Sequence, residues 1–201
     1  GTQVGMLRRS FGVAAEAIPM PCPGPAEGEF VPPSWNAGSS VLWVGRICRV
    51  KRPDRLLEVA TACPEVSFEI LGPPGEEDYA ASVLSRAREL PNVTLHGRVS
   101  RARMGDAYRQ ASALLCTSDH EGFPNTFLEA WSQGIPVVST FDPDGLIATR
   151  GLGGVAQDAA GLLASIRALT SSEASWLAAS ARGQDYYLQN HLPESVIPHF
   201  E

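Results

Sequence analysis

The chain has 201 residues, of which 44% are hydrophobic and 19% charged, a composition typical of one globular domain with a sizeable core. Its net charge of −6 argues against nucleic acid as the main partner, because such binding needs a basic face. No apolar run is long enough for a membrane span and no signal peptide is recognisable. We therefore expect a cytoplasmic protein and leave peripheral attachment to a membrane open.

The first 40 residues differ in composition from the rest. Residues 1–12 have the spacing of a helix that ends at Gly12, and residues 14–18 are compatible with a short strand. Residues 19–40 are rich in proline, glycine, serine and glutamate, which predicts a linker outside the core. We interpret residues 1–40 as the remnant of a preceding domain plus a linker, residues 41–190 as one domain, and residues 191–201 as a C-terminal tail.

From Val41 onward, short apolar runs alternate with amphipathic segments. The expected strands span residues 41–44, 66–71, 93–96, 113–117, 136–140 and 153–155. The expected helices span residues 53–63, 78–90, 100–110, 125–133, 156–169 and 172–190, with Ser171 as the cap of the last one. This alternation predicts an α/β fold with a Rossmann-like parallel sheet and helices on both faces.

Polar residues follow several of these strands directly, at the carboxyl ends where parallel sheets bind ligands. Gly45 and Arg46 follow the first strand, and Lys51 stands a few residues further on. Glycine permits close approach of the backbone, and two cations there could neutralise a diphosphate. A solvated basic loop explains the same residues equally well.

Two acids, Glu121 and Glu129, bracket the start of the predicted helix at residues 125–133. Pro124 suits the first position of that helix, because its missing N–H costs nothing there. Free amides at a helix N-terminus favour an anion, so residues 122–126 could hold a phosphate while the carboxylates accept hydrogen bonds from sugar hydroxyls. The alternative without a binding role is that one acid complements the helix dipole and the other is solvated.

Other chemistries lack their sequence patterns. The dinucleotide fingerprint, the phosphate-binding P-loop and the serine-hydrolase elbow are absent. The four scattered cysteines have no metal-ligand spacing and read as reduced thiols, and we expect neither a metal site nor a cofactor. Trp43, Phe127 and Trp131 have the spacing of core residues.

Four groups of residues together resemble the retaining glycosyltransferases of family 4. They are residues 44–46 with 51–53, 91–93 with 96–97, 117–118 with 121–130, and 134–138. The resemblance covers roughly residues 41–190. It implies the C-terminal, nucleotide-sugar-binding half of the two-domain GT-B fold. Residues 141–145 depart from the family, where many relatives carry a glycine-rich turn, and this leaves the sugar preference open.

The resemblance also implies roles for individual residues. Arg46 and Lys51 would bind the diphosphate of the donor and stabilise the leaving group, and Glu121 would hold hydroxyls of the donor sugar. Glu129 would bind the ribose. The remaining implied contacts, largely through the backbone, approach the phosphates, the sugar or the base: Gly45, Gly97, Arg98, Val99, Gly122, Phe123, Pro124, Asn125 and Thr126.

The implied reaction is metal-independent transfer of a sugar from a nucleoside diphosphate sugar to an acceptor hydroxyl, with retention of configuration. The acceptor, a sugar, a polysaccharide or a lipid-linked sugar, would be bound by the N-terminal domain that these residues lack. The chain alone should therefore bind the donor but transfer poorly. Two alternatives stay open, a nucleotide-sugar epimerase built on the same plan and a non-catalytic nucleotide-sugar-binding module.

Overall fold

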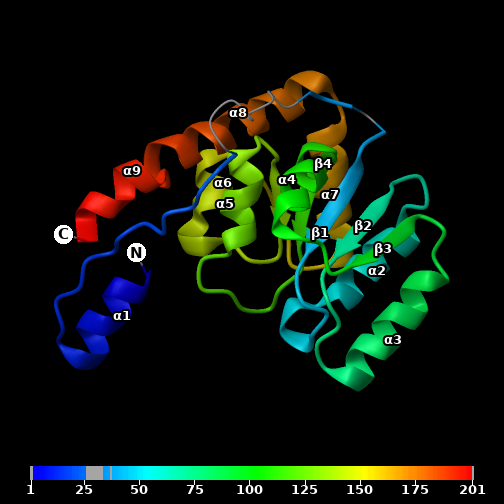
Figure 1. The fold of residues 1–201 in the computed structure, drawn as a ribbon, viewed down its shortest axis with the longest axis horizontal. Coiled ribbons are helices and arrows are strands. Elements are labelled where there is room, and N and C mark those ends of the chain that lie inside the picture. Colours follow the sequence, from blue (N-terminus) through cyan, green and yellow to red (C-terminus); the bar gives the residue numbers. More distant parts are fainter. Residues whose placement is uncertain (1, 26–33, 37, 201) are drawn as a thin grey trace.

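The computed structural model describes residues 2–25, 34–36 and 38–200. Its centre is a six-stranded parallel sheet in the order β3-β2-β1-β4-β5-β6 (Figure 1). The strands are β1 (Ser40–Val44), β2 (Phe68–Leu71), β3 (Val93–Gly97), β4 (Ala111–Cys116), β5 (Val137–Ser139) and β6 (Gly153–Val155). This is the strand order of doubly wound sheets, so the predicted Rossmann-like fold is confirmed.

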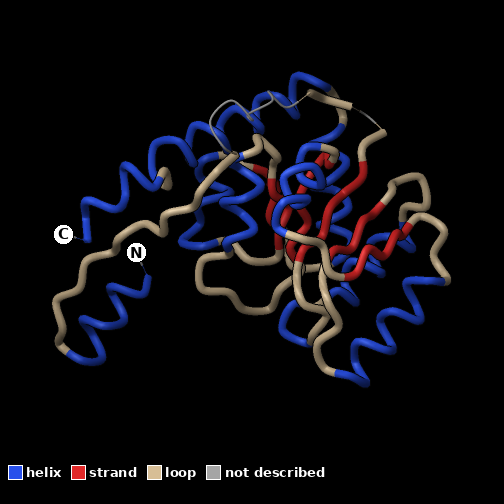
Figure 2. Tube along the Cα trace, in the orientation of Figure 1, coloured by secondary structure: helices blue, strands red, loops and turns tan. Residues whose placement is uncertain are grey.

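Helices connect and cover these strands (Figure 2). They are α1 (Thr2–Phe11), α2 (Pro53–Ala62), α3 (Glu77–Arg88), α4 (Arg101–Arg109), α5 (Asn125–Ser132), α6 (Leu146–Arg150), α7 (Ala159–Thr170), α8 (Glu173–Asn190) and α9 (Pro193–Val196), with 3₁₀ turns η1 (Arg49–Lys51), η2 (Pro143–Gly145) and η3 (Ile197–Phe200). Helices α2, α3 and α7 pack together on one face, α4 and α5 pack on the other, and α8 contacts α5 and α7. Within the described ranges, no helix has the length and apolar character that a membrane span requires.

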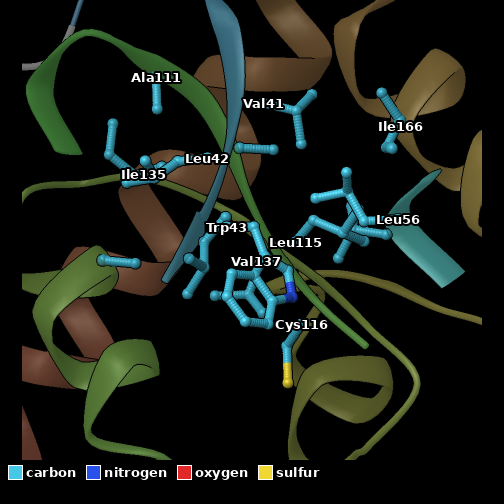
Figure 3. Close-up of a cluster of buried hydrophobic side chains, with 14 of the residues drawn as sticks. Val41, Leu42, Trp43, Leu56, Ala111, Leu115, Cys116, Ile135, Val137 and Ile166 are labelled. Carbon is cyan, nitrogen blue, oxygen red and sulfur yellow. The ribbon is translucent and has the colours of Figure 1, made fainter. Parts of the chain in front are cut away.

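The core is built around the two central strands. Every residue of β4 is buried, and β1 is buried over its first four residues. Strands covered on both faces read as continuous apolar runs, which is why both were recognisable in the sequence. Trp43, Phe127 and Trp131 are exposed by 2% or less, as expected for core residues. Figure 3 shows Trp43 among the buried side chains of this layer.

The N-terminal segment departs from expectation twice. The strand expected at residues 14–18 is wrong, because residues 12–24 have no regular structure and no strand pairs with them. The prediction that the linker stays outside the core is wrong at Cys22, which is 7% exposed. Its amide donates to the His191 carbonyl (2.9 Å), and the Tyr187 hydroxyl donates to the Cys22 carbonyl (2.9 Å). Residues 26–33 and 37 of the expected linker lie outside the described residues.

Two helix starts are set by side-chain caps and differ from the prediction. α7 begins at Ala159 rather than at residue 156, because the Asp158 carboxylate accepts a hydrogen bond from the Gly161 amide (2.7 Å). The cap of α8 is Ser172 rather than Ser171. In both cases the capping residue has an extended backbone, and its side-chain oxygen accepts a hydrogen bond from an amide in the first turn. The helix begins at the residue after this cap.

Several short helical segments were not predicted. No element was predicted for residues 143–150, but η2 and α6 occupy them. The start of α6 is stabilised by the Asp142 carboxylate, which accepts from the amides of Ile147 (2.7 Å) and Ala148 (3.2 Å). Residues 191–201 were expected to be a tail, yet they contain α9 and η3.

Candidate active site

The strand order reverses between β1 and β4, and in open α/β sheets the ligand crevice lies beyond the carboxyl ends of the strands at such a point. β1 ends at Val44 and β4 ends at Cys116. The loop after β1 carries Arg46 and Lys51, and the loop after β4 carries Glu121. The fold therefore places the candidate cations and the first candidate acid at one edge of the sheet.

Glycines bring the loops after β1, β2 and β3 into backbone contact. The Gly72 amide donates to the Gly97 carbonyl (2.7 Å), and the Gly45 amide donates to the Leu71 carbonyl (3.0 Å). Gly72 has a φ of 149°, and a Cβ added there would lie 1.8 Å from the Gly45 carbonyl oxygen. Only glycine fits this position, so the close packing of the loops depends on it.

The side chain of Arg46 extends from this packed edge into solvent. Its aliphatic stem lies over Gly75, where an added Cβ would be 2.9 Å from the Arg46 Cγ. The side chain is exposed, and its guanidinium forms no ion pair with any residue that the structure describes. A guanidinium in this state is free to bind a phosphate.

Lys51, the single lysine of the chain, ends the turn η1. Its carbonyl accepts a hydrogen bond from the Thr117 hydroxyl (2.8 Å), and that hydroxyl accepts one from the Trp43 indole N–H (2.9 Å). Trp43 belongs to β1 and Thr117 follows β4, and they are 2% and 1% exposed. The buried relay fixes the backbone of Lys51 to both central strands.

The side chain of Lys51 meets the first acid. Lys51 Nζ lies 2.5 Å from Glu121 Oε1, and the Ser118 hydroxyl donates to the same oxygen (2.6 Å). The side chains of Lys51 and Glu121 are 31% and 13% exposed, so solvent reaches the pair. The structure thus joins the cation expected at the diphosphate with the acid expected at the sugar.

A second set of ion pairs holds the same two loops together. Arg52 has a left-handed backbone (φ 48°, ψ 48°) at the cap of α2, a conformation that costs of order 1–3 kcal/mol outside glycine. Its guanidinium binds the Asp54 carboxylate (2.8–3.1 Å) and approaches Asp119 (3.4 Å), which also pairs with Arg55 (2.8 Å). These contacts offset the backbone strain and fix the loop of the lysine against the loop of the acid.

The N-terminus of α5 presents free amides next to this pair. Among the described residues, the amides of Gly122, Phe123, Asn125 and Thr126 donate no hydrogen bond. Pro124 is the cap of the helix rather than its first residue, and it has no N–H. A Cβ added at Gly122 would meet nothing within 4 Å, so the approach is open. This end of α5 can receive an anion.

Phe123 belongs to a cluster of rings that extends away from the sheet edge. Its ring lies 5.5 Å from His191 and 6.5 Å from Trp131, and Tyr186 contacts both of these rings. His191 Nδ1 lies 2.8 Å from the Met20 carbonyl oxygen. Burial lowers the pKa of His191 below its usual value, although the contact with Met20 opposes this. The cluster links the loop before α5 to the N-terminal segment.

The second acid, Glu129, lies in a different setting. It lines a cavity of about 350 Å³ between α4, α5 and residues 22–25. The Tyr108 hydroxyl donates to Glu129 Oε2 (2.8 Å), and Glu129 Oε1 accepts no hydrogen bond from a described residue. Burial and the negative charge of Glu129 raise the pKa of Tyr108 well above its usual value, so the phenol stays a donor. Burial, together with Glu129, also raises the pKa of the Cys22 thiol in this cavity to about 11.

The segment expected near the base is not brought to this cavity. Gly97 and Arg98 are exposed at the end of β3, and Val99 packs against the core. None of the three lines the cavity, whose wall on α4 begins at Arg101.

Sequence reasoning gave no role to Tyr108 and treated Thr117 and Ser118 only as part of a pattern. A serine three residues before an acid at a strand end is a signal that could have indicated the Ser118–Glu121 contact. Tyr108 and Glu129 are 21 residues apart on different helices, and no local spacing reveals their contact. No group of three or more metal-ligating side chains occurs within the described part of the chain.

The sequence profile described as glycosyl transferases group 1 matches residues 38–172, which is more than half of the chain and includes β1 to α7. The chain belongs to this family of glycosyltransferases.

Individual relatives match over shorter spans. A D-inositol 3-phosphate glycosyltransferase from Mycolicibacterium gilvum (strain PYR-GCK) is 34% identical over 108 residues, which cover 51% of this chain and 24% of that protein. The GtfA subunit of a UDP-N-acetylglucosamine–peptide N-acetylglucosaminyltransferase from Streptococcus pneumoniae serotype 4 is 27% identical over 110 residues, covering 53% of this chain and 21% of that protein. The chain thus matches a quarter or less of the length of these relatives.

Solved structures share the fold over the whole chain. Sucrose-phosphate synthase from Thermosynechococcus elongatus superposes with a TM-score of 0.81 at 16% identity, covering 100% of this chain and 55% of its own. A variant of TarM from S. aureus, in complex with fondaparinux, alpha-GlcNAc-glycerol and UDP, superposes with a TM-score of 0.77 at 19% identity. The match covers 99% of this chain and 41% of the TarM chain. These neighbours are GT-B glycosyltransferases, and at such identities the likeness shows the fold.

Proposed function

We propose that the chain is the donor-binding half of a retaining glycosyltransferase of family 4. It binds a nucleoside diphosphate sugar, from which the complete enzyme transfers the sugar to an acceptor hydroxyl. The observation that carries the proposal is the contact between Lys51 and Glu121 beside the free amides of α5. A group suited to phosphate and a group suited to sugar hydroxyls meet there, at the point where the strand order reverses.

Arg46 and Lys51 neutralise the diphosphate, and the free amides at residues 122–126 complete its binding site. When the bond between the sugar and the diphosphate breaks, negative charge grows on the leaving phosphate oxygen. Fixed cations and amides directed at that oxygen stabilise the transition state, and they supply the charge that a divalent ion supplies in other transferases. Glu121 accepts hydrogen bonds from the donor sugar.

The nucleoside extends from the diphosphate along α5. Glu129, which lines the cavity, accepts hydrogen bonds from the ribose through Oε1, the oxygen that Tyr108 does not bind. Gly97, Arg98 and Val99 do not line this cavity, and in the proposal their backbone contacts the base beyond it. Gly45 permits the approach of the donor to the end of β1.

The acceptor is bound by a separate domain. Residues 1–40 lead from it to the donor domain of residues 41–190, against which Cys22 packs, and residues 191–201 are the C-terminal extension of the donor domain. A sugar, a polysaccharide or a lipid-linked sugar fits this arrangement, in the cytoplasm or at the surface of a membrane. The chain alone binds the donor, and transfer requires the acceptor domain. UDP is the first nucleotide to test, since the TarM variant and pneumococcal GtfA are described in complex with it.

Calorimetric titration of the chain with UDP, GDP and ADP tests the proposal. We expect one diphosphate to bind, and Lys51→Met to weaken that binding at least tenfold, because a charge-assisted hydrogen bond is worth about 1.5–3 kcal/mol. Arg49→Met is the matched control on the same loop. Arg49 is 70% exposed and pairs with Glu76 (3.0 Å), so its loss should leave the affinity unchanged.

The single lysine allows an independent readout. Reductive methylation with ¹³C-formaldehyde labels only Lys51 and the N-terminal amine, so one NMR signal reports on the candidate phosphate site. We expect this signal to shift on addition of the diphosphate that binds. The proposal fails if none of the three nucleotides binds, or if binding leaves both the signal and the Lys51→Met affinity unchanged.

A further inference from the structure

The contact between Tyr108 and Glu129 joins two helices at the wall of the cavity. Tyr108 lies near the end of α4 and is 2% exposed, and Glu129 lies in the second turn of α5. The phenol donates its hydrogen bond to Glu129 Oε2 at 2.8 Å. A glutamate side chain has three rotatable bonds, so a fixed donor on one oxygen strongly limits the direction of the other.

We infer that Tyr108 is a positioning residue of the nucleotide site, which holds Oε2 of Glu129 so that Oε1 faces the ribose hydroxyls. This inference rests on the proposed function, in which Glu129 binds the ribose. Tyr108 also lines the cavity, but its hydroxyl is engaged by Glu129, so it acts through that carboxylate. It pre-organises the carboxylate, so the ordering of that side chain is completed on folding rather than on binding.

The surroundings favour a binding role over a purely structural one. A buried phenol needs a hydrogen-bond partner, but a backbone carbonyl would serve that need as well as a carboxylate does. Here the partner lines a cavity of about 350 Å³, a size within the range of roughly 300–1,000 Å³ typical of ligand pockets. Gln133 lines the same cavity, is 5% exposed, and has a buried Oε1 without a partner among the described residues. Gln133 is the C-cap of α5 and its Oε1 is closed to solvent, so Glu129 Oε1 is the acceptor that can meet the donors of a ligand in this cavity.

The test compares UDP with 2′,3′-dideoxy-UDP by calorimetry, using the chain and its Tyr108→Phe variant. We expect the unmodified chain to bind UDP about tenfold more tightly than the dideoxy nucleotide. The dideoxy nucleotide lacks the ribose hydroxyls and so loses one hydrogen bond to the charged Glu129 carboxylate. In Tyr108→Phe, binding of UDP should weaken about tenfold, while binding of the dideoxy nucleotide should not change. Tyr79→Phe is the matched control, because that phenol also donates to a carboxylate, of Asp54, outside the cavity.

The outcomes separate the inference from the function on which it rests. If the unmodified chain binds both nucleotides equally, the ribose role of Glu129 fails, and the role of Tyr108 fails with it. If the chain discriminates and Tyr108→Phe weakens both nucleotides equally, or neither, Tyr108 is only structural and the proposed function stands. A double-mutant cycle gives a second measurement. Glu129→Gln should lower the affinity for UDP in the unmodified chain and add little to Tyr108→Phe.

Discussion

Lys51 Nζ lies 2.5 Å from Glu121 Oε1, so the side chains assigned to the diphosphate and to the donor sugar bind each other in this structure. Under the proposed function, an arriving diphosphate must take the lysine from the acid. Because both side chains are partly exposed, the pair contributes at most about 1 kcal/mol and is easily exchanged. The pair therefore keeps the lysine in place without blocking the site.

Replacement of Glu121 by glutamine removes the competitor for the lysine. We expect Glu121→Gln to bind UDP, which carries no sugar, up to about fivefold more tightly, because the released pair is worth up to about 1 kcal/mol. Calorimetry measures the change, and Glu76→Gln, which frees Arg49 on the same loop, should leave the affinity as it is. Weaker binding of UDP to Glu121→Gln would show that the acid supports the phosphate site instead of competing with it.

The Thr117 hydroxyl connects the Trp43 indole to the Lys51 carbonyl inside the core. Thr117→Val keeps the shape but leaves the indole N–H buried without a partner. We expect a loss of about 1–3 kcal/mol in the free energy of unfolding, together with weaker UDP binding as the lysine loop loosens. Urea denaturation gives the first quantity. Thr117→Ser retains the hydroxyl and should lose much less, and equal stability of the valine and serine variants would rule out the relay.

The sheet, the central strands and the two-acid helix could be predicted from the sequence because each is a local pattern. β1 and β4 are apolar runs of strand length, and α5 follows a turn with proline at its cap. The loop residues Arg46, Lys51 and Glu121 could be placed at one edge of the sheet because parallel strands all end at that edge.

The remaining features depend on contacts between distant segments. The strand expected at residues 14–18 fails for lack of a neighbouring strand. Cys22 is held against the core by the Tyr187 hydroxyl of α8 and by the carbonyl of His191 just after that helix. Tyr108 reads as an ordinary core residue until α4 and α5 pack against each other. Such features follow from tertiary packing, which periodicity does not encode.

Gly72 is a strict requirement of the loop packing. In Gly72→Ala the added Cβ would lie 1.8 Å from the Gly45 carbonyl oxygen, on a backbone with φ of 149°. We expect a loss of at least about 3 kcal/mol in the free energy of unfolding, since strain and overpacking combine. Gly122→Ala, where the Cβ meets open space, should change stability by about 0.5 kcal/mol at most. Similar denaturation curves for both variants would contradict the packed arrangement of the loops.

His191 makes the stability of the fold depend on pH. It is 3% exposed, and its pKa is lowered from 6.5 by burial. The unfolded chain therefore takes up the proton at a higher pH than the folded chain does. The stabilisation is complete above pH 6.5 and is lost as the pH falls through the folded pKa.

We expect the melting temperature to fall between pH 7.5 and pH 5, by about 2–4 °C for each kcal/mol lost. The carboxylates whose pKa values are lowered, Asp54 and Glu65, titrate below this window. Differential scanning fluorimetry across the window should give a flatter profile for His191→Gln, while His120→Gln, at an exposed position, should retain the full slope. If the profile of His191→Gln keeps the slope of the unmodified chain, the proton is taken up elsewhere and the ring cluster around Phe123 is insensitive to pH.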